Sequence, residues 1–377
     1  MHEAPREPAA TGARAARRAL VALALAASVA VLILVYTERF GWSYYWMRFA
    51  AFYAVRTALL LVFAALALAA FVLGVLRPRR SLRAQRLGAA VLAVALTLTL
   101  LETVFQFVPR SHNVGYTLGA QVWSFWYWDE NELGYRDREH VAVPGKRLVF
   151  VVGDSFAAGA GLERTEQRFG DVLAEHLPEL HVLNLGKPGS DTLDELRRLR
   201  QHPLDPDALV VQYCENDIEG ALRRAGWQLP EWDAYGDLPQ AVAWVVRTSF
   251  LLNYVYWRFP HGDGAAYVDM LDRALADERV LGAHLDDLEG FCDFAEARGI
   301  PIYAVVFPSM LDPACDRAAT DRVVRAFVAR GVPVVDVGEL IREVPVAARS
   351  VNAYDAHPSA RVHQLVGEAL ARRMSGR

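Results

Sequence analysis

The chain has 377 residues and a hydrophobic fraction of 53%, which exceeds the usual range of a soluble protein. Residues 1–110 hold 13 Arg and 4 Asp or Glu, a net charge of +9, whereas the remainder holds 27 basic and 40 acidic residues, a net charge of −13. The acidic remainder argues against a nucleic-acid partner, because phosphate binding needs a basic face.

The apolar excess lies almost entirely before residue 110. Three runs there approach the roughly 20 residues that span a bilayer as a helix, namely residues 19–36, 57–76 and 87–108. Glu102 falls near one end of the third run, where an ionised side chain can reach the membrane interface. A cleaved signal peptide is the rival interpretation of the first run, but two more runs follow it. We therefore predict that residues 1–110 form a membrane anchor with three transmembrane helices.

Arginines predict the orientation of this anchor, because positively charged loops stay in the cytoplasm. Arg14, Arg17 and Arg18 directly precede the first run, and five arginines crowd the short loop between the second and third runs: Arg77, Arg79, Arg80, Arg83 and Arg86. This pattern predicts a multi-pass protein of a bacterial-type inner membrane, with the lipid bilayer as a partner. Residues 111–377 are then a domain on the extracytoplasmic side.

From residue 147 onward, short β-branched runs alternate with segments of helical periodicity. The runs are residues 148–153, 181–185, 208–213, 301–307 and 332–337, and the helical segments are residues 167–176, 191–201, 317–330 and 358–373. This alternation is typical of a parallel sheet covered on both faces. The predicted fold class is therefore α/β, a three-layer doubly wound domain.

An insertion at about residues 219–265 interrupts this pattern between the third and fourth strands. It contains four tryptophans and an apolar, helical-looking stretch over residues 241–258. Two interpretations stay open for this stretch, a packing helix and a lid or membrane-contacting element. A second aromatic cluster, residues 123–128, is either an interfacial belt or part of the folded core.

Chemistry-bearing residues follow the strands at the edge where ligands bind in open α/β sheets, the carboxyl ends. Ser155 follows the first strand, Gly189 the second and Asn216 the third, and Asp355 and His357 lie in the loop after the fifth. Each residue alone has an ordinary structural interpretation. Together, in this order, they predict a single site.

These blocks closely resemble those of the SGNH (GDSL) hydrolase superfamily over about residues 130–373. The resemblance implies that Ser155 is the nucleophile, His357 the base, and Ser155, Gly189 and Asn216 the oxyanion-hole donors. The sequence NELGYRDRE at 131–139, followed by VPGKRLVFVVGDSFAAGAG, resembles the leading segment of the membrane-anchored, envelope-associated branch. Many members of that branch act on acylated polysaccharides.

Two positions depart from the common pattern of that superfamily. The third block usually reads Gly-x-Asn-Asp, and Cys214 replaces its glycine here. The last block is often Asp-x-x-His, whereas this chain has Asp355-Ala356-His357, as in the Asp-x-His variant of some relatives that include alginate O-acetylation proteins. Asp355 is accordingly the expected orienting acid.

These residue types predict acyl transfer through a covalent intermediate: Ser155 attacks an ester carbonyl, His357 accepts its proton and Asp355 orients the imidazole. Water then gives a serine esterase that removes ester-linked acyl groups, acetyl first among them, from an envelope or extracellular glycan or lipid. A sugar hydroxyl gives an O-acyltransferase, for which a membrane partner protein would supply the donor. A non-catalytic binding module that keeps the fold is the third hypothesis.

No cofactor and no metal are expected. Gly159 and Gly161 are not followed by the Lys-Ser/Thr that a nucleotide loop needs. The three cysteines have no zinc-ligand spacing. One disulfide, between Cys292 and Cys315, is a further hypothesis that follows from an oxidising location.

Overall fold

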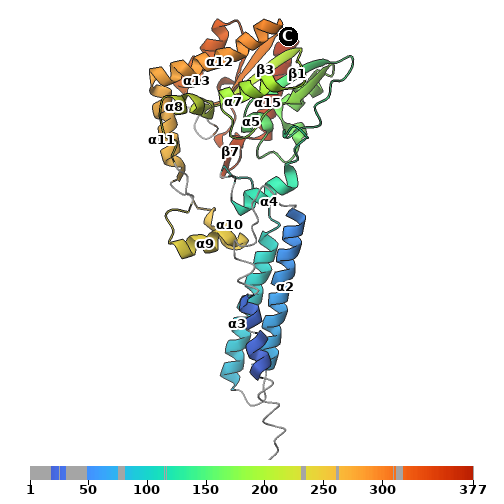
Figure 1. The fold of residues 1–377 in the computed structure, drawn as a ribbon, viewed down its shortest axis with the longest axis vertical. Helices are drawn as coiled ribbons and strands as arrows, with labels where there is room; N and C mark the ends of the chain where they lie inside the picture. Colours follow the sequence, from blue (N-terminus) through green and yellow to red (C-terminus); the bar gives the residue numbers. More distant parts are fainter. Residues whose placement is uncertain are drawn as a thin grey trace, which may run out of the picture. The chain divides into compact units, whose positions relative to one another are not determined.

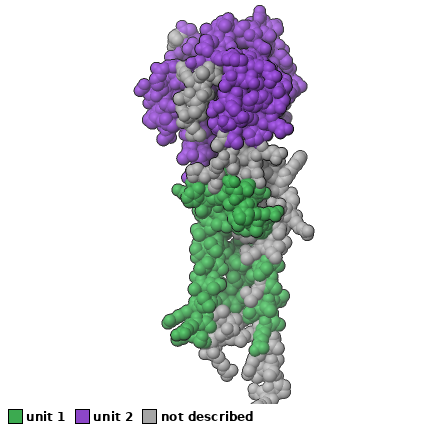
Figure 2. All heavy atoms as spheres, turned by 90° about the vertical axis from the view of Figure 1, so that its left-hand side faces the viewer, with its two compact units in different colours: residues 1–109, 116–122, 235–259 green, residues 110–115, 123–234, 260–377 purple. Residues whose placement is uncertain are grey.

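The computed structural model describes residues 18–24, 26–30, 49–74, 81–113, 115, 117–230, 235–259, 263–308, 310 and 317–376 (Figure 1). The chain divides into two compact units (Figure 2). Unit 1 comprises residues 1–109, 116–122 and 235–259, and unit 2 comprises residues 110–115, 123–234 and 260–377. The middle of the predicted insertion therefore clusters with the N-terminal helices rather than with the segments that flank it.

Unit 2 is built on a five-stranded parallel sheet with the order β2-β1-β3-β4-β5. Its strands are β1 (Arg147–Val152), β2 (Leu180–Asn184), β3 (Ala208–Tyr213), β4 (Ile302–Val306) and β5 (Val334–Asp336). All five predicted strands are thereby confirmed. The three central runs are apolar at nearly every position because helices cover both faces of a parallel sheet.

Helices cover this sheet on both faces, as the predicted α/β fold requires. The helices of unit 2 include α5 (Ser155–Ala158), α6 (Phe169–His176), α7 (Thr192–Gln201), α12 (Glu278–Arg298), α13 (Arg317–Ala329), α14 (Val337–Leu340) and α15 (Ala360–Met374), with 3-10 turns η2 (Thr165–Gln167), η3 (Glu215–Ile218) and η4 (Val346–Ala348). Helices α8 (Glu219–Arg224) and α11 (Asp263–Ala276) form a separate apolar cluster with η3 and the start of α12. Helices α6 and α15 share one apolar core with the sheet, and α7, α12 and α13 share the other. Gly367 lets α15 approach α6 closely, since a Cβ there would lie 2.6 Å from Val172.

The segment that carries Asp355 and His357 is a strand, where the sequence predicts a loop. Strands β6 (Ser350–Asn352) and β7 (Asp355–Pro358) form an antiparallel pair with an irregular register. The strands are only three and four residues long, which leaves no alternation for a sequence pattern to reveal. The antiparallel pairing fixes the backbone on which both side chains stand.

Unit 1 contains the helices α2 (Phe49–Gly74) and α3 (Leu82–Phe105), which pack against each other. Of the helices in the described ranges, α3 alone is long and apolar enough to cross a membrane. The apolar part of α2, Arg56–Val72, falls short of that length. The first predicted span, residues 19–36, is helical at 18–24 and 26–30 and otherwise lies outside the described residues.

The other described helices of unit 1 are α9 (Gln240–Thr248) and α10 (Phe250–Tyr256), together with the first turn of α4 (Leu118–Tyr127). The stretch predicted as one helix over 241–258 is thus two helices, because Ser249 leaves the helical conformation and caps α10 by accepting from Leu252 N. Glu102, which was expected to lie near one end of the third span, is buried in the protein at 3% exposure and paired with Arg56 of α2.

Candidate active site

Ser155 stands where β1 turns into the four-residue helix α5. Asp154 caps this helix by accepting a hydrogen bond from Phe156 N at 2.8 Å. Gly153 is required before it, since a Cβ there would lie 2.2 Å from Gln212 Oε1. That Gln212 oxygen accepts from the backbone N–H groups of Asp154 and Ala157, both at 3.0 Å. The nucleophile turn is therefore fixed from the neighbouring strand β3.

Asp154 joins the predicted nucleophile to the predicted oxyanion donor. Its Oδ2 accepts from Ser155 Oγ at 3.2 Å and from Asn216 Nδ2 at 3.0 Å. The thiol of Cys214 lies 3.2 Å from the same oxygen, and its single proton is shared with the nearer Oδ1 of Asn216, at 2.7 Å. The structure thus brings Ser155 and Asn216 to one carboxylate that is wholly buried. The sequence analysis assigned no role to Asp154. The available signal was a carboxylate between a strand end and a helix start, which is also the pattern of an ordinary N-cap.

His357 and Asp355 form a close pair on β7, with 2.5 Å between His357 Nδ1 and Asp355 Oδ1. Burial alone would raise the pKa of Asp355, but the charge of His357 and hydrogen bonds from His357 and Ser111 lower it to about 2. Burial likewise opposes the charged imidazole, yet the Asp355 carboxylate and the more distant Asp154 raise the pKa of His357. Asp355 therefore stays ionised and holds the Nδ1 proton, which leaves Nε2 as the basic nitrogen.

The His357 ring lies beside the nucleophile helix. It contacts the ring of Phe156 edge to face, with 5.6 Å between centroids. Gly161, at φ +82°, packs closely against the His357–Asp355 pair, since a Cβ at this position would lie 2.9 Å from Asp355 Oδ2. Among the described residues, the hydroxyl of Ser155 is bonded to Asp154 and not to His357. Catalytic hydrogen bonds are often long in the free enzyme and tighten with substrate.

Gly189 lies in the loop after β2 at φ +72°, a conformation that favours glycine. A Cβ there would meet no atom within 4 Å, and no hydrogen bond among the described residues uses its N–H. Gly186, which the sequence analysis did not single out, touches the nucleophile helix directly. A Cβ at Gly186 would lie 2.4 Å from Ala158 N.

Arg136, within the leading segment, is a third residue that sequence reasoning missed. It is buried and donates to the carbonyl oxygens of Gly159, at 2.5 Å, and Leu162, at 2.6 Å. These hydrogen bonds hold the loop that follows the nucleophile helix. The guanidinium also lies over the rings of Trp123 and Trp128, which favours the core interpretation of those two members of the aromatic cluster.

Three buried groups could bring ligand atoms to a metal ion: Asp154, Cys214 and Asp217, whose atoms lie within 4.8 Å of one another. Burial and neighbouring carboxylates raise the pKa values of Cys214 and Asp217 well above their usual range. A metal ligand has to be deprotonated. Because Oδ2 of Asp154 already accepts hydrogen bonds from Ser155 and Asn216, this group fits a hydrogen-bond network better than a cation site.

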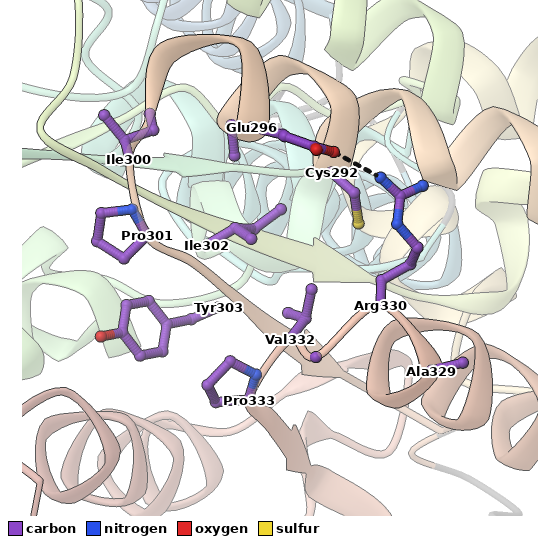
Figure 3. A pocket seen from close by; sticks show the side chains of 12 residues that line it. Cys292, Glu296, Ile300, Pro301, Ile302, Tyr303, Ala329, Arg330, Val332 and Pro333 are labelled. Carbon is purple, nitrogen blue, oxygen red and sulfur yellow. Dashed lines mark hydrogen bonds and ion pairs between the residues drawn. The ribbon is translucent and has the colours of Figure 1, made fainter.

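A pocket of about 610 Å³ lies at the opposite end of the strands (Figure 3). Its lining includes the start of β4, the residues before β5, and Arg330, which pairs with Glu296 and two further acids of α12. Cys292 lines it as a free, buried thiol. Its predicted disulfide partner, Cys315, lies outside the described residues. None of the predicted site residues borders this pocket.

The model of the GDSL-like Lipase/Acylhydrolase family matches residues 151–365. The chain belongs to this family. The match runs from the end of β1 to α15 and so includes every predicted site residue. Ester hydrolysis is the activity that membership of the GDSL-like family implies.

Several solved structures resemble the chain distantly. A lipase/acylhydrolase from Enterococcus faecalis is 16% identical, with 61% of this chain and 96% of that one covered and a TM-score of 0.40. A lipolytic protein of the G-D-S-L family from Desulfitobacterium hafniense is 14% identical, with 60% and 99% covered and a TM-score of 0.39. The structure of TesA is 17% identical, with 60% and 99% covered and a TM-score of 0.37. No curated protein matches the chain.

Proposed function

We propose that this GDSL-like protein is a serine esterase in which Ser155 attacks the ester carbonyl and His357, oriented by Asp355, accepts its proton. The observation that carries this proposal is the buried carboxylate of Asp154, which bonds both Ser155 and Asn216 while the His357–Asp355 pair packs against the same helix. Nucleophile, amide donor and base are thus held by one connected set of contacts. Water then hydrolyses the acyl-enzyme.

The oxyanion would be stabilised by the N–H groups of Ser155 and Gly189 and by the Asn216 amide. Asn216 Nδ2 carries two protons. One is engaged by Asp154, and the other remains for the developing charge. A preorganised donor of this kind contributes about 100- to 1,000-fold to the rate.

Serine-directed fluorophosphonate labelling of the full-length protein tests the mechanism, followed by turnover of acyl esters of increasing chain length. Ser155→Ala should lose both the label and turnover, and His357→Ala should lose turnover, while circular dichroism stays that of wild type. Ser375→Ala, an exposed serine after α15, is the matched control and should keep both. Turnover that persists in a clean Ser155→Ala preparation would refute the serine mechanism.

For the substrate, we propose acyl groups, acetyl in particular, on an envelope glycan or lipid. The protein is proposed to be anchored by three membrane helices in a bacterial-type inner membrane, with the hydrolase unit on the outer side. Support comes from the apolar helix α3 and from the five arginines at residues 77–86, two of which, Arg83 and Arg86, lie in its first turns. A reporter that is active only outside the cytoplasm should work when fused after residue 115 and fail when fused after residue 82.

Transfer of the acyl group to a sugar hydroxyl would use the same residues, so a cellular measurement has to separate the two reactions. Deleting the gene should leave the envelope with more ester-linked acyl groups if the protein is an esterase. Fewer acyl groups, restored by wild type and not by Ser155→Ala, would instead identify an O-acyltransferase.

A further inference from the structure

Helices α9 and α10 of unit 1 bury one side and leave large apolar side chains exposed on the other. The buried side includes Ala243 and Val246 of α9 and Phe250 of α10. The exposed apolar side chains are Val242, Trp244, Val245, Leu252, Val255 and, just after α10, Phe259. A helix in contact with water normally carries polar residues on its outer side. Here the outer side is largely apolar, and Gln240 and Arg247 are exposed polar residues of α9.

Charge in the same segment is of one sign. Residues 240–259 contain Arg247 and Arg258 and no Asp or Glu, although residues 111–377 as a whole are strongly acidic. Aromatic and aliphatic side chains combined with arginine are typical of helices that lie in a membrane interface. The composition therefore fits the surface of an anionic bilayer.

A buried ion pair fixes the two helices to α2 and α3 of the same unit. Glu102 of α3 accepts from Arg56 Nη2 at 2.5 Å and from Ser249 Oγ at 2.8 Å. It also accepts from the backbone N–H groups of Phe250, at 2.8 Å, and Leu251, at 3.1 Å. Glu102 thus acts as a cap for α10 that is supplied by another helix.

Arg56 completes this clamp from α2. Its Nη2 donates to Thr248 O at 3.1 Å, the last residue of α9, and its guanidinium lies over the Phe250 ring. A carboxylate and a guanidinium buried in apolar surroundings persist only when each is paired. The junction between α9 and α10 is therefore held in one place against α2 and α3 (Figure 1).

The position of the clamp along α3 sets the depth of α9 and α10. Glu102 lies three residues before the end of α3 at Phe105, which is about 5 Å along a helix. The ring of Phe105 itself contacts Tyr254 of α10, with 4.7 Å between centroids. If α3 spans the bilayer, α9 and α10 lie at the level where that span ends, which is the lipid interface.

We propose that the exposed side of α9 and α10 is a membrane-docking surface that inserts Trp244, Val245 and Val255 into the outer lipid interface, at a depth set by the Arg56–Glu102 clamp. This rests on one part of the proposed function, the crossing of the bilayer by α3. Of the interpretations left open for residues 241–258, the proposal favours a membrane-contacting element. The occupant of this side is a lipid surface, because its apolar side chains adjoin the end of the membrane helix and its only charges are arginines.

Site-directed spin labelling of the full-length protein tests the proposal. Single cysteines replace Val245 and Val255 in the full chain reconstituted into vesicles of phosphatidylethanolamine and phosphatidylglycerol. Each label is measured for collision with oxygen, which concentrates in lipid, and with a water-soluble nickel chelate. Parent protein without an added cysteine gives the background from native thiols. Two control positions are Val94 on α3 and Val328 on α13, both exposed valines on helices.

Labels at 245 and 255 should collide with oxygen several-fold more, relative to nickel, than the label at 328. If the label at 94 reports lipid while those at 245 and 255 match 328, the docking surface is refuted and the anchor stands. If the label at 94 also reports water, the anchor itself fails. Spin–spin broadening at 245 that disappears on dilution with unlabelled protein would assign this side to a second copy of the chain and overturn the lipid assignment.

Glu102→Gln tests the clamp separately. The amide keeps one acceptor but leaves Arg56 without its counter-charge, so the label at 245 should shift toward nickel accessibility and gain mobility. The label at 94 should not change. An unaltered label at 245 in this variant would refute the role of the clamp in setting the depth.

Discussion

Replacing Asp355 with asparagine is the most informative single change at the site, because it removes the charge that acts on His357 with little change in shape. The pKa of Asp355 falls from 3.8 to about 2. At about 1.4 kcal/mol per unit this corresponds to roughly 2 kcal/mol of interaction with its surroundings, of which His357 is the main favourable part. The side chain is only 2% exposed, so solvent screens little of it.

Loss of this interaction in the transition state alone should slow turnover roughly 30-fold, since about 1.4 kcal/mol is tenfold in rate. Asparagine also permits the wrong imidazole tautomer, which in the chymotrypsin triad costs about 10⁴-fold. The expected loss in kcat therefore lies between about 30-fold and about 10⁴-fold. The fold should be retained, because the amide can still contact Ser111.

The pH dependence of kcat/KM is a second measurement on the Asp355→Asn variant. His357 must be neutral to accept a proton, and Asp355 raises its pKa. Removing the carboxylate lowers that pKa, so the acid limb of kcat/KM should move to lower pH even as the rate falls. Initial rates of ester hydrolysis across the acid limb measure both effects. Asp194→Asn, which alters a partly exposed carboxylate paired with Arg197 on α7, is the control and should change neither.

Wild-type kcat with an unmoved acid limb in Asp355→Asn would show that another acid orients His357.

The Asp355–His357 pair also predicts how the stability of the fold depends on pH. The depressed pKa of Asp355 stabilises the fold above pH 3.8, and this contribution is lost as pH falls toward about 2. The raised pKa of His357 stabilises the fold below its ordinary value of 6.5, and this contribution is lost as pH rises through the folded-state value.

Three further predictions concern the neighbours of Ser155. Asn216→Ala should lower kcat about 100- to 1,000-fold in the ester assay with little change in KM, because two backbone donors remain; a loss below tenfold would exclude it as a donor. Cys214→Gly restores the common family residue but removes a donor to Asn216, worth about 1 kcal/mol, so kcat should fall roughly fivefold. Cys214→Ser, which keeps a donor, should stay near wild type, and equal rates in both variants would contradict this. Gly186→Ala places a Cβ 2.4 Å from Ala158 N and should lower the denaturation midpoint sharply. Gly189→Ala meets open space and should reduce the free energy of unfolding by only about 1 kcal/mol, because of its positive φ. A larger loss of stability in Gly189→Ala than in Gly186→Ala would refute this packing.

Sequence reasoning succeeded where a single physical pattern determines the outcome. The strands of the sheet were predictable because burial on both faces makes runs such as Leu148–Val152 uniformly apolar. Position at the strand ends was then enough to place Ser155 and Asn216 at one edge of the sheet. The roles of the individual side chains within the family motif stay predictions, which the variants above test.

The features that sequence reasoning missed depend on partners that are distant in the chain. Arg136 contacts a loop more than 20 residues away, and Glu102 caps a helix that begins 148 residues later. Neither partner leaves a local pattern. The break at Ser249 is hidden for the same reason, since a serine within an apolar helical stretch becomes a cap only when the surrounding structure stabilises the new helix start.

The departure at Cys214 has a physical explanation in the orientation of Asn216. An amide can be rotated so that its oxygen and nitrogen exchange places, and only its partners decide between the two orientations. Here Oδ1 faces the thiol of Cys214 at 2.7 Å and Nδ2 faces the carboxylate of Asp154 at 3.0 Å. Burial and the nearby carboxylates raise the pKa of Cys214, so it remains a protonated donor. A glycine at this position would have no side-chain donor for Oδ1 of Asn216. The thiol supplies that donor and so fixes the amide with Nδ2 toward Asp154. The second proton of Nδ2 then remains for the oxyanion.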